Sequence, residues 1–181
     1  MTELQKLGMS LAVAYNDDES LLDDFTRHAQ DIDEIYLPVP CDVAGTMRIW
    51  YGSAPEAYKQ TLPGIAARMR DLGIAVDMVI NTNYMPFHEH ARVARYTAEV
   101  MDMGIRRFTI CDLSLARAVR ELCPEAEIIV SMSAGIDTPA RARHWQREVQ
   151  PQRIVVPPSQ NKRPDALANL SKMGIPLEVI V

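Results

Sequence analysis

The sequence lacks several features that would place the protein in a particular class. No apolar run approaches the roughly 18 residues of a membrane span, and the N-terminus has no basic segment followed by an apolar one. These absences argue against a membrane or secreted protein and leave the cytoplasm as the expected compartment. A formal net charge of −5 argues against generic binding to a nucleic-acid backbone.

Cysteine is also scarce. The three cysteines, Cys41, Cys111 and Cys123, are odd in number and have no metal-ligand spacing, so we expect reduced thiols. Three cysteines cannot supply the four thiolates of a common iron–sulfur cluster. We therefore expect no cofactor and no metal centre in this chain by itself.

Familiar catalytic motifs are absent too, including a Gly-rich phosphate loop, a nucleophile elbow and a His-Glu-x-x-His sequence. His88-Glu89-His90 has the residue types of a metal-ligand pair, but residues two apart do not share a helix face. We interpret it as a solvated helix start, where the helix dipole favours the glutamate. Cys111 precedes the carboxylate of Asp112, which disfavours a reactive thiolate, so we expect a buried structural thiol.

The clearest structural pattern lies between Met101 and Ser133. Gly104 follows a helical segment, at the position where a left-handed residue commonly ends a helix. Residues 106–111 are typical of a strand, Asp112 can cap the amphipathic helix that follows, and residues 127–132 form a second apolar strand. This order predicts a βαβ unit whose strands are buried on both faces, as in a parallel sheet.

The same unit recurs along the chain. Three tripeptides combine an apolar residue, a helix-ending glycine and an isoleucine that enters a strand: Leu72-Gly73-Ile74, Met103-Gly104-Ile105 and Met173-Gly174-Ile175. The glycines are 31 positions apart (73 to 104) and then 70 apart (104 to 174). A period of about 30 to 35 residues is typical of βα repeats in a barrel or a doubly wound sheet.

Hydrophobic periodicity extends this pattern and predicts seven strands with six intervening helices. The predicted strands are residues 11–15, 34–39, 75–80, 106–111, 127–132, 153–156 and 177–181. Three of the helix starts carry local signals, which are an N-cap at Ser20, an N-cap at Thr138 before Pro139, and Pro164.

These elements fall short of a complete (β/α)8 barrel, which needs about 250 residues. We therefore predict one α/β domain over residues 1–181, an incomplete TIM-type barrel of seven parallel strands and six helices. An open seven-stranded parallel sheet is the structural alternative. In either architecture the last strand leaves an edge that proteins usually cover. We expect a truncated piece of a longer barrel, or a homo-oligomer or partner subunit that covers the open edge.

In βα barrels the active site lies at the C-terminal ends of the strands. The residues expected there form a polar and mostly neutral rim, which favours hydrogen bonding to a small polar ligand over acid–base chemistry. For Asp112, Ser133 and Asn161 the alternative is that they only cap helices. No residue is assigned a catalytic role. The candidate ligand-binding residues are Asn16, Asn81, Asn83, Asp112, Ser131, Ser133, Gln160 and Asn161.

From Ile74 to Val181 the order of short motifs resembles the barrel of the U32 peptidase-like proteins, the collagenase-like group. The likeness depends on the order and spacing of these motifs. They are Ile80-Asn81-Thr82, Gly104, Cys111-Asp112-Leu113, Ser131-Met132-Ser133 where the family commonly has Ser-Thr-Gln, Val155-Val156-Pro157-Pro158 with Asn161, and the closing residues Leu177 to Val181.

The resemblance implies a (β/α) barrel and more than proteolysis. Members of the group include RNA hydroxylation factors and oxygen-independent ubiquinone-biosynthesis hydroxylation proteins, and many hold a 4Fe–4S cluster on four cysteines. The first of these cysteines typically follows the last strand present here, and no cysteine of this chain matches those positions. A cluster is therefore expected only with a further C-terminal segment.

Three functional hypotheses follow. The first is an enzyme or enzyme fragment that takes part in hydroxylation of an RNA or a quinone precursor. The second is a non-catalytic barrel subunit that binds a small polar ligand or stabilises a partner. The third, peptide hydrolysis, is the weakest, because the sequence offers no convincing nucleophile–base pair or metal pair.

Overall fold

A computed structural model describes residues 6, 8–45 and 54–180. Within these residues, seven strands form one parallel sheet in chain order: β1 (Ala12–Ala14), β2 (Glu34–Pro38), β3 (Ala75–Ile80), β4 (Arg107–Ile110), β5 (Glu127–Val130), β6 (Arg153–Val155) and β7 (Leu177–Glu178). The helices are α2 (Glu19–Arg27), α3 (Pro55–Asp71), α4 (His90–Asp102), α5 (Leu113–Leu122), α6 (Pro139–Val149) and α7 (Pro164–Ser171). Short 3₁₀ turns follow three strands: η1 (Phe87–Glu89), η2 (Met132–Ala134) and η3 (Pro158–Gln160).

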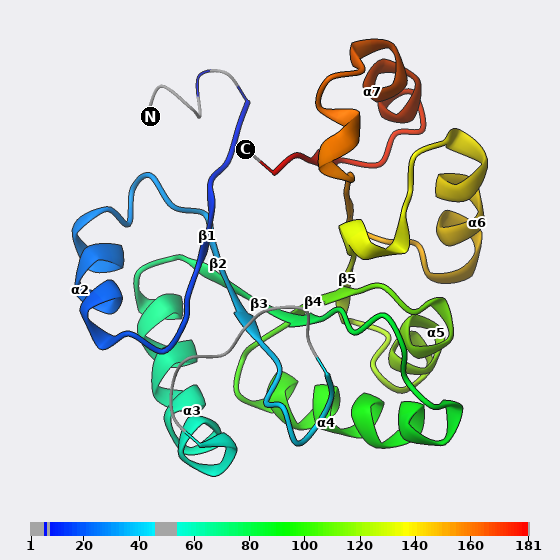
Figure 1. The fold of residues 1–181 in the computed structure, drawn as a ribbon. Coiled ribbons are helices and arrows are strands. Elements are labelled where there is room, and N and C mark those ends of the chain that lie inside the picture. Colours follow the sequence, from blue (N-terminus) through cyan, green and yellow to red (C-terminus); the bar gives the residue numbers. More distant parts are fainter. Residues whose placement is uncertain (1–5, 7, 46–53, 181) are drawn as a thin grey trace.

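The sheet curls into part of a barrel. Each strand pairs in parallel with the next one in the chain, and the strand order never reverses. Because parallel crossovers are right-handed, helices between strands in this order all pack on the same face. Figure 1 shows them in a ring around the outside of the curled sheet. The prediction of an incomplete TIM-type barrel with seven strands and six helices is confirmed for the described residues.

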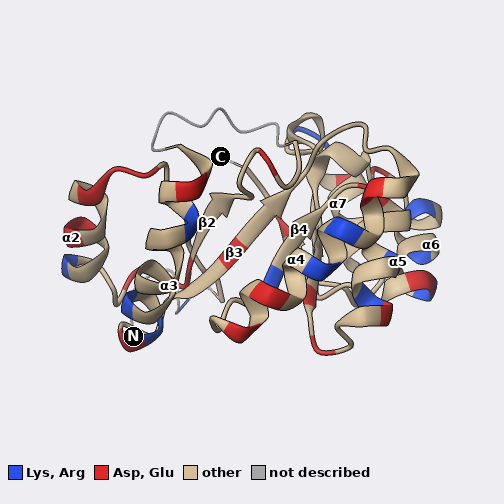
Figure 2. Cartoon of the chain, turned by 90° about the horizontal axis from the view of Figure 1, so that it is seen from below, with Lys and Arg blue, Asp and Glu red and all other residues tan. Residues whose placement is uncertain are grey.

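Strand residues alternate between the two faces of the sheet. Ile35, Met78, Phe108 and Ile128 point toward the helices and are fully buried in the main apolar core. Full burial of such a side chain stabilises the fold by roughly 1.5–3 kcal/mol relative to exposure. Charged residues occur along the helices (Figure 2), and no helix in the described part of the chain is long and apolar enough to cross a bilayer.

The helix starts follow the capping signals with one exception. Asp112 accepts hydrogen bonds from two backbone N–H groups of α5, and Thr138 caps α6 ahead of Pro139. The predicted N-cap at Ser20 is wrong, because α2 already begins at Glu19. Asp18 caps this helix, and its carboxylate accepts from the backbone N–H of residue 20 at 3.0 Å.

The strands of the second half end earlier than predicted. β5 ends at Val130 because Ser131 begins the turn η2, where its hydroxyl accepts from the backbone N–H of Ser133. β7 spans two residues only, and beyond it the backbone carbonyl of Ile180 accepts from the Asn161 side chain. Residue 181, which the prediction included in the last strand, lies outside the described residues.

Five charged side chains link strands across the inside of the curled sheet. Glu34 on β2 is 3% exposed and accepts from Arg107 on β4 and Arg153 on β6, both at 2.6 Å. The Arg107 Nε atom also donates to Glu127 at 2.9 Å. The Arg153 Nε atom lies 2.8 Å from Glu178, in an ion pair without hydrogen-bond geometry. The ion pair between Glu34 and Arg153 therefore connects β2 directly to β6, which lies four positions away in the sheet.

The repeat glycines yield a first prediction. Gly104 has a φ of +96°, and the nearest atom to an added Cβ would be Arg70 Nη1 at an ordinary contact distance of 3.6 Å. A Gly104→Val substitution therefore meets backbone strain rather than a steric clash. We expect the free energy of unfolding to fall by more than ~1 kcal/mol, measured by thermal and urea unfolding.

Gly64 provides the matched control for this experiment. It lies inside α3, shows no positive φ, and an added Cβ would have no heavy atom within 4 Å. We expect Gly64→Ala to raise the free energy of unfolding by about 0.5–1 kcal/mol. Unchanged unfolding of the Gly104→Val variant would contradict the left-handed helix end.

A second prediction concerns the interior charges. Glu34→Gln keeps the side-chain shape but leaves Arg107 and Arg153 with one carboxylate each. We expect the free energy of unfolding to fall by about 2 kcal/mol, because a buried charge that loses a partner is costly. In the control Glu125→Gln, the lost carboxylate is 79% exposed and pairs with Arg106 at 3.3 Å, and we expect a change within about 0.5 kcal/mol. Equal effects would show that the interior network does not hold the strands together.

Candidate functional site

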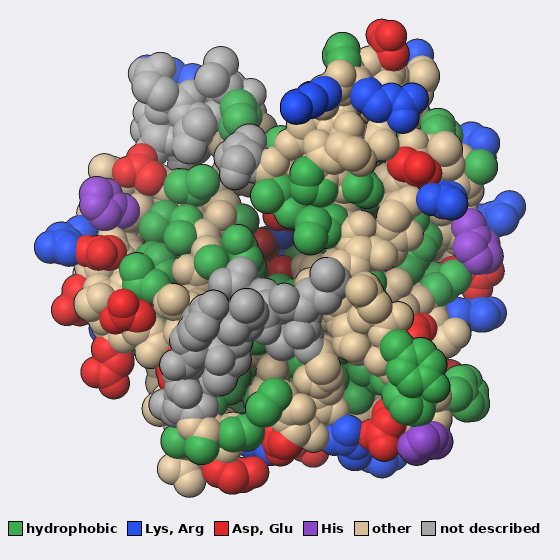
Figure 3. Space-filling model, in the orientation of Figure 1, with side chains coloured by type: hydrophobic (Ala, Val, Ile, Leu, Met, Phe, Trp, Pro, Cys, Tyr) green, Lys and Arg blue, Asp and Glu red, His purple; other side chains and the backbone are tan. Residues whose placement is uncertain are grey.

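The concave face of the sheet encloses a hollow of about 250 Å³. Figure 3 shows an opening into the middle of the molecule, with acidic and basic atoms visible at its base. Six polar residues from neighbouring elements line the hollow, and four apolar residues complete it. The polar residues are Tyr36, Asp77, Asn81, Thr109, Ser131 and Glu178, and the apolar ones are Val79, Met132, Val155 and Ile180.

The alternation of the strands places these polar groups together. Tyr36 on β2 is in register with Asp77 on β3, and Val79 two residues further is in register with Thr109 on β4. On the opposite side, Val155 on β6 is in register with Glu178 on β7. All of these residues point to the inner face of the sheet, whereas the residues between them in each strand point to the helices.

Asp77 is the most deeply buried carboxyl group of the hollow, with 3% of the residue exposed. Thr109 Oγ1 donates a hydrogen bond to Asp77 Oδ2 at 2.5 Å. The Oδ1 atom of Asp77 has no hydrogen-bond partner among the described residues. Asp77 is the one charged residue of β3, whose sequence is AVDMVI.

The surroundings of Asp77 shift its protonation. Burial raises the pKa of its carboxyl group to about 7, and the nearby charge of Glu34 adds to that rise. The hydrogen bond from Thr109 and the positive charge of Arg153 act in the opposite direction without cancelling it. A carboxyl group with this pKa exchanges its proton near neutral pH, so it can act as a donor or as an acceptor toward a ligand.

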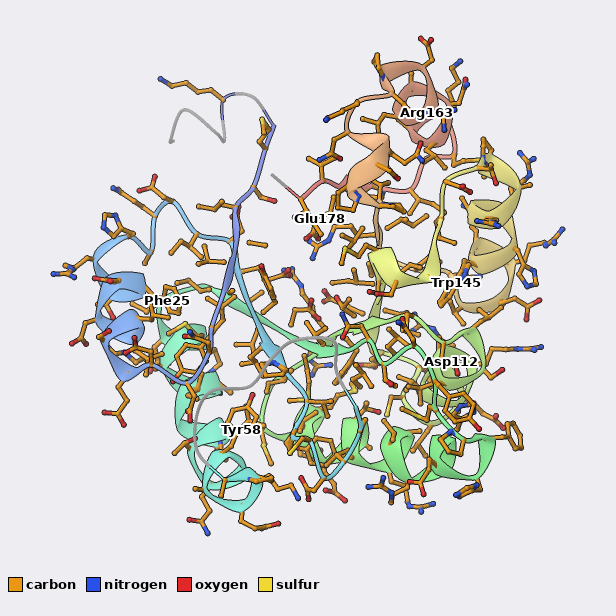
Figure 4. All side chains as sticks on the ribbon, viewed as in Figure 1. Phe25, Tyr58, Asp112, Trp145, Arg163 and Glu178 are labelled. Carbon is orange, nitrogen blue, oxygen red and sulfur yellow. The ribbon has the colours of Figure 1, made fainter. Side chains whose placement is uncertain are left out.

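Glu178 is the second carboxylate of the hollow. Burial raises its pKa, while the charge of Arg153 lowers it. Figure 4 labels Glu178 beside the space enclosed by the sheet, whereas Asp112 lies at the start of α5. Asp77 and Glu178 therefore face the same hollow from strands four positions apart, β3 and β7.

Two of the sequence-predicted site residues lie in this lining. Asn81 follows β3 and Ser131 follows β5, and both are buried. The Ser131 hydroxyl also accepts from the backbone N–H of Ser133 at 3.3 Å, so it stabilises a turn as well as facing the hollow. Their role in ligand binding stays a prediction.

The other six predicted residues do not line the hollow. Asp112 caps α5, and Asn161 donates from Nδ2 to the backbone carbonyl of Ile180 at 2.6 Å, which ties η3 to the end of β7. Gln160 is buried, and its Oε1 atom has no partner within the described part of the chain. The remaining three are the exposed Asn16 and Asn83 and the half-buried Ser133.

The segment His88-Glu89-His90 matches the predicted helix start only in part. His88 is exposed, but His90, the first residue of α4, is buried, so the expectation of a fully solvated segment is wrong. Its ring packs edge-on against Phe87 with centroids 5.3 Å apart. His90 Nε2 lies 3.4 Å from Asp112 Oδ2 without forming a hydrogen bond. Among the described residues, no group of three or more His, Cys, Asp or Glu side chains is arranged to hold a metal ion.

The cysteines do not fit a 4Fe–4S cluster, which needs four thiolates. Cys41 is exposed in the loop after β2, Cys111 is half-buried after β4, and Cys123 is buried after α5. The Cys111 thiol donates to the backbone carbonyl of Thr82 at 2.8 Å. Burial, assisted by the charge of Asp112, raises the pKa of Cys111 to about 11, so this thiol is not a reactive nucleophile at neutral pH.

The site predicted from the sequence does not include three polar residues that lie within strands. These are Asp77, Thr109 and Glu178, whereas the predicted site residues follow the ends of the strands. The available signal was the polar residue at alternate positions of otherwise apolar strands, such as Asp77 in AVDMVI. A polar residue that recurs on the inward side marks an interior that is not filled by apolar packing.

The fold is similar to several solved barrels. The U32 peptidase Mk0906 matches with a TM-score of 0.73 and 20% identity, over 94% of this chain and 67% of that one. A glycerophosphodiester phosphodiesterase from Agrobacterium tumefaciens matches with a TM-score of 0.58 and 16% identity, over 94% and 86% of the two chains. An enolase protein from Sargasso Sea environmental sequencing matches with a TM-score of 0.56 and 14% identity, over 94% and 46%. At these identities the matches show a shared fold.

A comparison with curated proteins gives no match. The sequence pattern of peptidase family U32, however, matches residues 30–181, which span β2 to β7 and all the polar residues that line the hollow. The match therefore covers six of the seven described strands and the candidate site, and the chain belongs to peptidase family U32.

Proposed function

We propose that the interior hollow of this U32-family barrel binds a small polar molecule. The observation that carries the proposal is the lining itself, where six polar side chains converge between apolar walls. Ligand pockets commonly combine an apolar lining with a few placed polar groups. A volume of about 250 Å³ lies just below the roughly 300–1,000 Å³ that is common for ligand pockets, so it suits a small molecule.

The polar groups offer a mixed set of hydrogen bonds. Asn81 and Ser131 each have donor and acceptor capacity, and the Asp77 carboxyl group contributes an oxygen that no described residue contacts by hydrogen bond. A ligand that fills the hollow would satisfy this buried oxygen, whose isolation otherwise costs free energy. These features support binding of a molecule with several polar groups.

For the activity of the protein, we propose participation in a hydroxylation reaction on an RNA or quinone-type substrate, as the family resemblance implies. The chemistry of such a reaction would depend on a redox centre outside the cysteines of this chain. Peptide hydrolysis, the activity in the name of the similar solved structure, has less support. Cys111 has a raised pKa, and neither ring nitrogen of His90 has a hydrogen-bond partner among the described residues. A non-catalytic role as a binding subunit needs only the hollow.

We also propose that the open side of the sheet is covered by a second copy or a partner subunit. In the described residues β1 and β7 are the two edges of the sheet and do not pair with each other. Apolar side chains are exposed next to both edges, with Met9 and Leu11 near β1 and Val179 and Ile180 after β7. Exposed strand edges with apolar neighbours favour association.

The binding proposal can be tested by filling the hollow. In a ligand-observed NMR screen of small polar metabolites, we expect the wild-type chain to bind at least one compound. Val79→Phe places a larger side chain in the lining and should weaken that binding at least tenfold. In the control Leu122→Phe, the enlarged side chain lies on α5 at a position that is 50% exposed, and binding should not change. Binding that survives Val79→Phe in a folded variant would place the ligand elsewhere.

The association proposal is tested by light scattering together with iron and zinc analysis of the purified chain. We expect a mass of at least twice the 20.3 kDa of one chain, or co-purification of a partner, and no bound metal. A metal-free monomer would contradict covering of the edges in trans. Bound iron would contradict the expectation that these three cysteines hold no cluster.

A further inference from the structure

The charges inside the barrel do not balance. The network of Glu34, Glu127 and Glu178 has one more carboxylate than it has guanidinium groups, and Arg107 and Arg153 each contact two of these carboxylates. Both interior arginines are thus already paired with carboxylates. Asp77 adds a fourth carboxyl group to the same interior.

Asp77 forms no ion pair in the described part of the chain. Its one hydrogen bond comes from the neutral hydroxyl of Thr109 and occupies Oδ2. Oδ1 has no hydrogen-bond partner within the residues that the structure describes, although the residue is 97% buried and lines the hollow. An isolated buried carboxylate is costly, so such a site favours the arrival of a positive charge.

We propose that the hollow binds the ammonium group of a small organic amine, with Asp77 as its counter-ion. This inference rests on the proposed binding function and specifies the ligand class. The ammonium group donates to Asp77 Oδ1, while Thr109 continues to donate to Oδ2. Glu178, on the facing side of the hollow, adds to the negative potential, and Asn81 and Ser131 hydrogen-bond the uncharged part of the ligand.

Two other classes of ligand fit the same site less well. A metal ion requires several carboxylate, thiolate or imidazole ligands together, and no such group of three occurs among the residues that the structure describes. An anion would have to displace Glu34 or Glu178 from the arginines and would lie beside an excess of carboxylates. An ammonium group meets neither obstacle.

The protonation of Asp77 supports the proposal and gives it a pH dependence. Burial raises the pKa of Asp77 to about 7, so without a ligand the carboxyl group holds a proton at lower pH. An ammonium group competes with this proton. Binding should therefore weaken about tenfold for each pH unit below 7 and become independent of pH above it. The charged groups that act on Asp77 are Glu34 from β2, Arg153 from β6 and Glu178 from β7.

Three probes of equal length test the ligand class. They are 4-aminobutan-1-ol, butane-1,4-diol and 4-hydroxybutanoate, which carry a positive, a neutral and a negative end. We expect saturation NMR titrations with the full chain at pH 8 to show at least tenfold tighter binding of the amine than of the diol, and weakest binding of the carboxylate. Repeating the amine titration from pH 5.5 to 8.5 should give the predicted slope.

The variant Asp77→Asn keeps the shape of the side chain and removes its charge. We expect it to weaken amine binding at least tenfold at pH 8 and to abolish the slope with pH. The control Glu125→Gln removes an exposed carboxylate on the outside and should leave both unchanged. Should Asp77→Asn fail to fold, the pH slope of the wild-type chain still decides the question.

The outcomes distinguish the proposal that an amine binds to Asp77 from the more general proposal that the hollow binds a small polar molecule. Preferred binding of the diol or the carboxylate, or amine binding that is independent of pH, would overturn the assignment of an amine while leaving the hollow as a binding site. Amine binding that Val79→Phe does not weaken would place the probe outside the hollow and contradict both proposals. Tighter binding of the amine with the expected slope, lost in Asp77→Asn, would support both.

Discussion

The salt bridges from Glu34 to Arg107 and Arg153 are the constraint on which the rest of the structure depends. Backbone hydrogen bonds join only neighbouring strands, so they alone would allow the sheet to open or flatten. Glu34 instead connects β2 to β6 across the interior, through an ion pair between residues 119 positions apart in sequence. Because the carboxylate is almost completely buried, its loss would leave two guanidinium groups short of a partner. The curvature that creates the hollow is therefore fixed by charge as well as by packing.

Charges in this position change what the interior can contain. A typical (β/α)8 barrel fills its centre with layers of branched apolar side chains. Here the inward positions carry Glu34, Asp77, Thr109 and Glu178, while the bulky apolar residues lie between the sheet and the helices. Most of the apolar burial that stabilises the fold therefore lies in the outer layer. The inner face is left free to hold a cavity and polar side chains, which a packed apolar centre would exclude.

The sequence allowed the architecture to be predicted because its signals are local. Gly104 and its two repeat partners mark helix ends by their positive φ, and Asp112 and Thr138 mark helix starts. The interior could not be predicted in the same way. Which face of a strand points inward depends on the closure of the sheet, and the pairing of Glu34 with Arg153 depends on contacts far apart in sequence. Only Asn81 and Ser131 of the predicted site reached the hollow, because both follow strands directly on their inward side.

The depth of Asp77 in the barrel gives its carboxyl group an environment that the residues of the predicted rim do not have. Most residues of the predicted rim are exposed or half-buried, and Asp112 is used as a helix cap. At the N-terminal ends of the strands, the carboxylate of Glu34 is neutralised by arginines. Asp77 lies between these two layers, almost fully buried and without an ion-pair partner among the described residues. Near its pKa of about 7 the carboxyl group passes between a protonated and an ionised form, so it can act as a hydrogen-bond donor or as an acceptor.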